Sequence, residues 1–292
     1  MKTFTLIGLL LFTSCISNAR KQLNVLVIFA HPDEGEIYTG GTSALYTRDG
    51  HKVKFLSLTN GDAGHYEMKP EDLAKRRLKE AMKAKEVLKL VDYEVLNNHD
   101  GVLRNTEENR DKVIQCIKHF KADIVFTYYP AEGGHNDNMT AGWIVREAAP
   151  KLKMGKMPVF VYVRDFHTTR FSFIPDIAII IDEVWEIKLV ACGAHESQVI
   201  EFNPNLEGVL EEVLASKEKQ KEFLFHNTYP YSMVTNDNRL TLEKWYGNEK
   251  ASKVKYVEAF EIAEFGRQVS DEEILEFFPM INAEIEQSGS QH

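Results

Sequence analysis

Short apolar runs alternate with longer segments of helical periodicity from residue 23 to about residue 194, and this alternation limits the fold more than any other feature. Strands are predicted over residues 23–30, 52–59, 93–97 and 122–128, and two further apolar segments cover 157–163 and 176–181. Helices are predicted over residues 38–49, 70–90, 106–120, 140–149 and 183–194. We therefore expect an α/β fold: a Rossmann-like, doubly wound, mostly parallel sheet with helices on both faces.

The pattern changes after Pro204. A charged helical stretch covers residues 207–226, and a tail of mixed polar and aromatic residues follows it. We expect residues 21–203 to form the main domain and residues 204–292 to form a C-terminal α+β extension that packs on it. An independent extension is the alternative, because a chain of 292 residues is long enough for either arrangement.

Residues 1–20 predict a signal peptide. Lys2 supplies a positive charge, residues 4–12 form an apolar run too short to span a bilayer, and small residues lead to Cys15. This arrangement resembles a bacterial lipobox, in which the cysteine carries the lipid. We expect a secreted or cell-envelope-anchored protein whose only membrane association is a lipid anchor on Cys15, with simple secretion as the alternative.

The charge balance excludes one class of partner. The chain has 35 Lys and Arg against 44 Asp and Glu, which gives a formal net charge of −9. Binding a phosphate backbone requires clustered basic residues, so nucleic acid is not an expected partner. Cys116 and Cys192 lie in segments with helical periodicity and lack the spacing of a metal or disulfide pair, which predicts buried free thiols.

Residues with acid–base or metal-binding side chains follow the expected strands. They gather in four segments, at residues 31–34, 59–65, 97–101 and 129–138. Ligands bind at the carboxyl ends of strands in α/β sheets, and a metal-assisted hydrolase needs imidazole and carboxylate groups in one place. An ordinary turn in which Asp33 or Glu34 caps the next helix is the alternative for the first segment. Convergence of four such segments favours a functional site.

The motifs in these segments occur in a recognisable order. His31-Pro-Asp-Glu34 is followed by Gly40-Gly41-Thr42, Thr59-Asn-Gly-Asp-Ala-Gly64, Arg77-Leu-Lys-Glu80, Asp100-Gly101, His135-Asn-Asp-Asn138 and His195-Glu-Ser-Gln198. Together they resemble the zinc-dependent PIG-L, or LmbE-like, de-N-acetylase family, whose usual first motif is His-Pro-Asp-Asp. The resemblance covers about residues 23–200 and implies an N-acetylglucosaminyl deacetylase-like domain over residues 21–203.

The resemblance also implies roles for individual residues. Its metal-ligand positions fall on His31, Glu34 and Asn138. Its catalytic positions fall on Asp33, His135, Asp137 and Arg77. Asp33 would be the general base that takes a proton from metal-bound water, and His135, oriented by Asp137, would stabilise the oxyanion or protonate the leaving amine. Arg77 would lie close to the site.

Two ligand positions depart from the family pattern. Glu34 replaces Asp and adds a methylene, while Asn138 replaces His with a neutral amide that is an uncommon zinc ligand. Zinc is the expected ion, with water, His65 or His99 completing its coordination. An oxygen-rich ligand set also suits Mn, Mg or Ca, and a site without metal is the third alternative.

These observations predict a metal-dependent amidase that removes an acetyl group from an N-acetylated amino sugar or glycoconjugate. Such chemistry needs a Lewis acid to polarise the carbonyl and a carboxylate to accept a proton from water. The substrate would be a small molecule or a glycan. The alternatives are a catalytically weak or inactive carbohydrate-binding surface lipoprotein, and an interaction domain that uses the aromatic tail.

Overall fold

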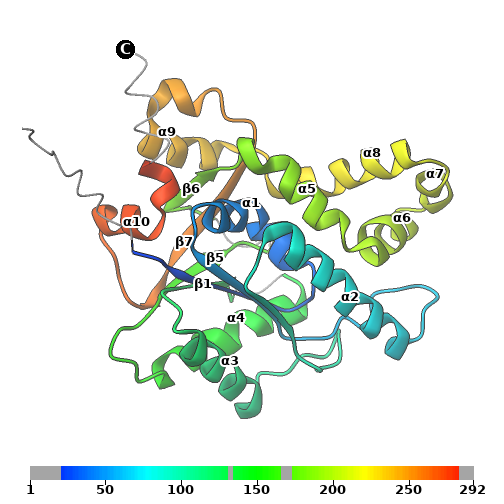
Figure 1. Ribbon diagram of the computed structural model, residues 1–292, viewed down its shortest axis with the longest axis horizontal. Coiled ribbons are helices and arrows are strands. Elements are labelled where there is room, and N and C mark those ends of the chain that lie inside the picture. The colour runs from blue at the N-terminus through cyan, green and yellow to red at the C-terminus, as the bar shows by residue number, and fades with distance from the viewer. Residues whose placement is uncertain (1–20, 131–133, 166–172, 283–292) are drawn as a thin grey trace, which may run out of the picture.

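A seven-stranded sheet forms the centre of the computed structural model, which describes residues 21–130, 134–165 and 173–282 (Figure 1). The strands lie in the order β3-β2-β1-β4-β5-β7-β6. They are β1 (Asn24–Phe29), β2 (Lys52–Ser57), β3 (Asp92–Val95), β4 (Ile124–Tyr128), β5 (Val159–Val163), β6 (Ile177–Ile180) and β7 (Val257–Gly266). Neighbouring strands from β3 to β5 pair in parallel, whereas β7 runs antiparallel to both β5 and β6.

Helices cover both faces of this sheet (Figure 1). One face carries α1 (Glu34–Arg48), α2 (Pro70–Leu88) and α5 (Trp185–Gly193), and the other carries α3 (Glu107–Phe120) and α4 (Asn136–Ala148). The chain continues through a π-helical turn, η3 (Ser197–Phe202), then α6 (Asn203–Leu206), α7 (Leu210–Leu214), α8 (Lys217–Thr228), α9 (Asn236–Ala251) and α10 (Asp271–Phe277). The expected doubly wound, mostly parallel α/β fold is confirmed.

The central strands are apolar because both of their faces are covered. Every residue of β4 and β5 is buried, as is all of β1 after Asn24. Strands covered on both sides read as continuous hydrophobic runs rather than alternating ones, which is why the sequence revealed them. Cys116 and Cys192 are buried free thiols, as predicted.

Two helices begin four residues earlier than the sequence predicted. Helix α1 starts at Glu34 rather than residue 38, and α4 starts at Asn136 rather than residue 140. The first turns of both helices contain polar residues, which are equally common in loops. Acidic side chains are favoured in the first turn of a helix, so Glu34 and Asp137 belong to the helices themselves.

The C-terminal segment contributes directly to the sheet. Strand β7 inserts between β5 and β6, with Tyr162 opposite Glu261 and Ala178 opposite Ala259. Glu258 on β7 is fully buried, and its carboxylate accepts the backbone N–H groups of Gly41 and Thr42 in α1. The domain boundary at residue 203 stays a prediction.

The buried partner of Glu258 comes from α5. The Lys188 ammonium group lies 2.7 Å from the Glu258 carboxylate and donates to the Ser232 hydroxyl. Removing one partner of a buried pair leaves an uncompensated charge, so this contact fixes how α1, α5 and β7 pack together.

The predicted signal peptide at residues 1–20, including Cys15, lies outside the described residues. Within the part of the chain that the structure describes, no helix has both the length and the apolar character needed to cross a membrane.

Candidate active site

A cavity of about 390 Å³ opens at the carboxyl ends of β1 to β4. Its walls combine the turn after β1, the loops after β2 and β3, the start of α4, and side chains from α2 and η3. Of the seven predicted site residues, six line it: His31, Asp33, Glu34, Arg77, His135 and Asn138. The seventh, Asp137, is buried directly behind His31. The structure therefore brings the whole predicted set together.

His31 is surrounded by carboxylates. Its Nδ1 atom lies 3.0 Å from the Glu34 Oε1 atom, and its Nε2 atom lies 2.8 Å from Asp100 and 3.5 Å from Asp137. Burial alone would lower the pKa of this imidazole, but Glu34, Asp100 and Asp137 together raise it well above its ordinary value. The ring thus sits where positive charge is strongly favoured.

Asp137 is held by the loop after β3. Its two carboxylate oxygens accept the backbone N–H groups of Gly101, at 2.8 Å, and Leu103, at 3.0 Å. Burial opposes ionisation, but His31 and these backbone donors lower the pKa of Asp137. Asp137 contacts His31 through this arrangement, whereas the resemblance placed it beside His135.

Asp100 was not among the predicted site residues. Burial opposes its charge, yet His31 and Arg77 lower the pKa of its carboxyl to about 2. His31, Asp100 and Asp137 present ligand atoms within 4.8 Å of one another, a grouping that could hold a metal ion. The sequence placed Asp100 in a strand-end segment but could not show which ring nitrogen of His31 it would face.

Asp33 is paired with Arg77. The guanidinium Nη2 atom lies 3.1 Å from Asp33 Oδ1, and it donates to the Pro32 carbonyl while Nη1 donates to the Gly61 carbonyl. Burial raises the pKa of Asp33, and the positive charge of Arg77 opposes that rise. Arg77 therefore fixes the position of the carboxylate while limiting its affinity for a proton.

Glu34 folds back over the preceding turn. Its Oε2 atom accepts the backbone N–H of His31 at 2.8 Å, while Oε1 faces the His31 ring. Burial would raise the pKa of Glu34, but His31 outweighs it and lowers the pKa. The extra methylene of Glu is accommodated by this bend, and the carboxylate stays beside the imidazole.

Asn138 donates a hydrogen bond to Asp165, a residue that was not among the predicted site residues. The Asp165 carboxylate, which follows β5, accepts the backbone N–H of His135 at 2.8 Å and the Asn138 amide at 3.3 Å. The Oδ1 atom of Asn138 is buried and meets no hydrogen-bond donor among the described residues. Asp165 lies two residues after the end of β5. The expectation that site residues follow the carboxyl ends of strands therefore applies to it as well.

His65 and His99, the two histidines considered as additional metal ligands, each lie against a carboxylate outside the cavity. The His65 ring lies 3.0 Å from Glu201, and the His99 ring lies 2.7 Å from Asp62. His65 and His99 are absent from the cavity lining, so neither is placed to complete a coordination shell on His31.

The donor chemistry around His31 and Arg77 fits a divalent cation. Four carboxylates, those of Asp33, Glu34, Asp100 and Asp137, lie against these two groups. Negative groups outnumber positive ones by two even when His31 is protonated, and an unpaired buried charge is costly. The buried, unpartnered Asn138 oxygen adds a neutral ligand atom to the same cavity.

Comparison with known proteins identifies relatives that are named as de-N-acetylases. Residues 26–149 match the PIG-L family, described as GlcNAc-PI de-N-acetylase. The chain is 31% identical over 186 residues to the Bacillus cereus protein named "Probable N-acetyl-alpha-D-glucosaminyl L-malate deacetylase 2", covering 61% of this chain and 84% of that one. It is 32% identical over 189 residues to the diacetylchitobiose deacetylase of Thermococcus kodakarensis, covering 60% and 69%.

The fold alone does not specify the reaction. The solved structure of a 4-carboxy-2-hydroxymuconate hydratase from Pseudomonas putida superposes with a TM-score of 0.63 at 19% identity, covering 85% of this chain and 98% of that one. Similar folds can host different chemistries, so the sequence relatives carry the assignment. On their evidence, the chain belongs to the PIG-L family of de-N-acetylases.

Proposed function

We propose that this protein is a metal-dependent hydrolase that removes the acetyl group from an N-acetylated amino sugar or glycoconjugate. The observation that carries the proposal is one cavity in which Asp33, held by Arg77, lies beside His31 and its carboxylates. The names of the two sequence relatives support the reaction and point to N-acetylglucosamine derivatives as the substrate class.

The residues proposed to hold the metal are His31, Glu34 and Asn138. Glu34 faces the Nδ1 atom of His31, and Asn138 supplies a buried amide oxygen. Asp100 and Asp137, which could themselves hold an ion together with His31, face the other ring nitrogen. In this proposal they orient the metal-binding histidine and do not bind the ion. Zinc is the proposed ion, and Mn, Mg or Ca suits the oxygen-rich set as well. A bound divalent cation would polarise the acetamide carbonyl and increase the acidity of water.

The remaining steps belong to side chains of the cavity. As water attacks the carbonyl carbon, Asp33 accepts its proton, and Arg77 keeps the Asp33 carboxylate in place. His135, exposed at the entrance, stabilises the oxyanion or donates a proton to the amine as the carbon–nitrogen bond breaks. The products are acetate and a free amino sugar.

Acetate release tests this proposal. Purified full-length protein, supplied with zinc, manganese or magnesium, is incubated with N-acetylglucosamine and with N,N'-diacetylchitobiose. Asp33→Asn should lower kcat by about a thousandfold, because it removes the proton acceptor but keeps the shape of the side chain. Circular dichroism should show an unchanged fold in the variant. Equal rates for the two proteins, or sugar binding without acetate release under any ion, would contradict the proposal.

The proposed location is outside the cytoplasm. A signal peptide over residues 1–20 with lipidation of Cys15 is supported by the sequence pattern alone. Metabolic labelling with a fatty acid should mark the parent protein and leave Cys15→Ser unmarked. Labelling of both, or of neither, would exclude an anchor at this cysteine.

A further inference from the structure

Five exposed lysines share one position in the sheet. Each of them either begins one of the parallel strands β1 to β5 or lies three residues before it. They are Lys21, Lys52, Lys89, Lys121 and Lys156. Because the strands lie in the order β3-β2-β1-β4-β5 and neighbouring strands are about 4.8 Å apart, these residues form a row about 20 Å long. We call this row the basic edge.

Contacts between the strand starts confirm that the row is continuous. Lys21, before β1, and Lys156, before β5, lie 2.6 Å and 3.4 Å from the same carboxylate oxygen of Asp123. The backbone carbonyl of Lys121 accepts a hydrogen bond from the Asn24 side chain at 3.1 Å. The first residues of β1 and β2 are paired directly. The five lysines therefore belong to one surface.

Acidic residues are few along the basic edge. The three residues before each of the five strands include two acidic ones, Asp49 and Asp123. Within the part of the chain that the structure describes, the exposed side chains of Lys52, Lys89 and Lys121 form no ion pair. A chain with a formal net charge of −9 thus carries a local surface of the opposite sign.

Helix ends explain only part of this pattern. Lys89 and Lys121 follow α2 and α3 directly, where a positive charge suits the C-terminus of a helix. Lys21, Lys52 and Lys156 lie at strand starts instead, beyond the last turn in which the helix dipole acts. A lysine at each of the five strand starts is therefore a property of the whole edge.

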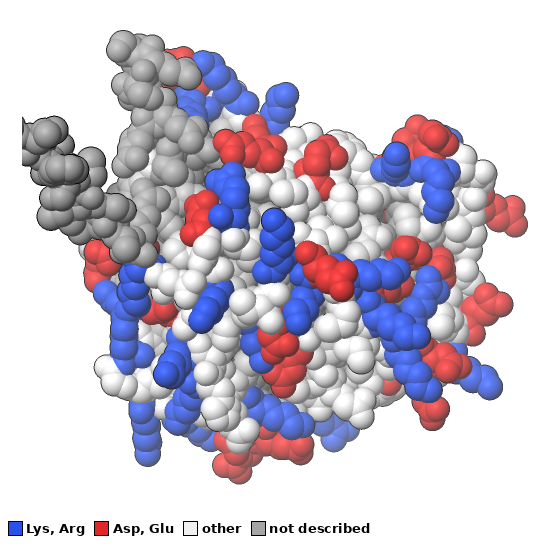
Figure 2. Space-filling view, viewed as in Figure 1, with Lys and Arg blue, Asp and Glu red and all other residues white. Residues whose placement is uncertain are grey.

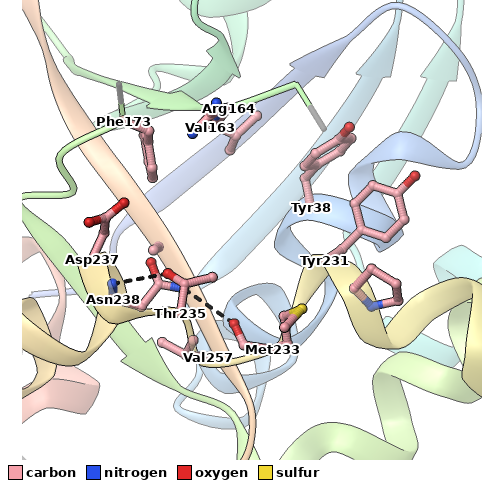
Figure 3. Close-up of a pocket in the computed structure, with 12 residues that line it drawn as sticks. Tyr38, Val163, Arg164, Phe173, Tyr231, Met233, Thr235, Asp237, Asn238 and Val257 are labelled. Atoms are coloured by element: carbon pink, nitrogen blue, oxygen red, sulfur yellow. Dashed lines mark hydrogen bonds between the residues drawn. The ribbon is translucent and has the colours of Figure 1, made fainter. Parts of the chain in front are cut away.

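The opposite edge of the sheet carries the cavities. The catalytic cavity opens at the carboxyl ends of the strands, and a further cavity of about 300 Å³, lined by Val163 and Arg164 at the end of β5, lies on the same side (Figure 3). A strand of the length of β1 measures about 20 Å, so the basic edge lies that far from the catalytic residues. Figure 2 shows numerous basic side chains along the lower left of the molecule, the side on which β1 begins in Figure 1.

We propose that the basic edge binds the anionic phospholipid headgroups of a membrane, so that the catalytic cavity opens away from the bilayer. Each lysine near such a surface adds to the attraction, which falls off within a Debye length. Ammonium groups on flexible stems act as point charges without a fixed geometry, which suits a fluid layer of phosphates. The acidic remainder of the chain is repelled by the same surface, and this repulsion favours the proposed orientation.

The proposed lipid anchor would approach the membrane from the same edge. Lys21 leads into β1, and five residues separate it from Cys15. Even a fully extended link of this length spans at most about 20 Å. A lipid chain combined with a polybasic surface binds a membrane more stably than a single lipid chain does. The anchor belongs to the proposed location, whereas the basic edge is argued from the positions of its charges.

Vesicle binding tests the basic edge. Full-length protein carrying Cys15→Ser, which removes any anchor, is sedimented with vesicles of phosphatidylcholine alone or of equal parts phosphatidylcholine and phosphatidylglycerol. The edge variant combines Lys52→Gln, Lys89→Gln and Lys121→Gln. The control variant removes the same charge from exposed positions on α8 by combining Lys217→Gln, Lys219→Gln and Lys221→Gln. Circular dichroism should show the same fold in all three proteins.

We expect the parent to bind the phosphatidylglycerol vesicles at least about tenfold more tightly than the edge variant, because three lysines are lost from the contact. The control variant should bind as the parent does. High salt should remove the difference between the parent and the edge variant. All three proteins should bind phosphatidylcholine alike, and this binding measures what the apolar residues 4–12 contribute.

Equal binding of the three proteins to phosphatidylglycerol vesicles, or an equal loss in the control variant, would overturn the proposal. Retention of the parent by a soluble polyanion such as heparin, without binding to vesicles, would also overturn it and assign the edge to a different class of partner. These measurements do not use acetate release. A failure of the basic edge therefore leaves the proposed hydrolase standing, and a failure of the hydrolase leaves the basic edge standing.

Discussion

Asn138 is the position at which the proposed metal site departs most from the family pattern. The family pattern has His at this position, and the structure gives Asn138 a different set of contacts, with its amide nitrogen against Asp165 and its oxygen buried without a partner. A neutral amide oxygen is a weaker zinc ligand than an imidazole nitrogen. If residue 138 faces the ion as proposed, the replacement of His by Asn lowers the affinity for zinc and makes the ligand set richer in oxygen.

Asn138→His should therefore raise zinc affinity by about tenfold or more, measured by competition with a chromogenic chelator. Asn136→His is the matched control, because it places the same side chain on an exposed position in the same turn of α4. Unchanged zinc affinity in Asn138→His, or an equal gain in Asn136→His, would show that residue 138 does not face the ion.

At the scale of elements, the sequence predicted most of what surrounds the site. The turn after β1 and the loop after β4 were found because each follows an apolar run that is buried on both faces. The loops after β2 and β3 were found although these strands are only partly buried, because polar site residues follow both of them. The starts of α1 and α4 were wrong by four residues, since their first turns are made of polar site residues. The pairing of β7 with β5 could not be predicted, because it joins residues about a hundred positions apart and the sequence pattern carries no register.

The Gly40-Gly41-Thr42 motif is explained by packing between elements. A Cβ atom on Gly41 would lie 2.7 Å from the Ile181 side chain, and the backbone N–H of Gly41 donates to buried Glu258. Helix α1 can approach Ile181, which directly follows β6, this closely only with glycine at position 41. The motif thus allows α1 to pack against the part of the sheet formed by β6 and β7.

Gly41→Ala should lower the free energy of unfolding by about 1–2 kcal/mol, because overpacking against Ile181 outweighs the gain in helix propensity. Urea denaturation measures the change. Gly155→Ala provides the control, since a Cβ there meets nothing within 4 Å, and its effect should stay within about 0.5 kcal/mol. A stabilised Gly41→Ala protein would refute the packing argument.

At the scale of the whole molecule, acidic groups are in excess, and they cover the visible surface together with basic ones (Figure 2). One acidic residue, Glu261, makes the free energy of unfolding depend on pH. Partial burial on β7, together with nearby Asp176 and Glu264, raises the pKa of Glu261 to about 7. The unfolded chain releases this proton near its ordinary pKa of 4.5, so the free energy of unfolding falls as the pH rises from about 4.5 to 7.

Glu261→Gln should remove this fall in the free energy of unfolding, because the amide does not ionise. At pH 8 the variant should be more stable than the parent by about 1 kcal/mol, a value reduced for solvent screening, and at pH 4 the two should be equal. Denaturation curves at both pH values measure the difference. Glu207→Gln, at an exposed position, should follow the parent throughout. An equal gain at pH 4 and pH 8 would assign the effect to packing rather than to ionisation.

The central claim is that an altered ligand set still holds a catalytic divalent cation. The most direct test strips the full-length protein with a chelator and follows acetate release from N,N'-diacetylchitobiose as zinc, manganese or magnesium is added back. We predict that release stops on stripping, returns with one equivalent of ion per chain, and does not return in His31→Ala. Acetate release that survives complete metal removal, or one tightly bound ion without any acetate release, would contradict the account.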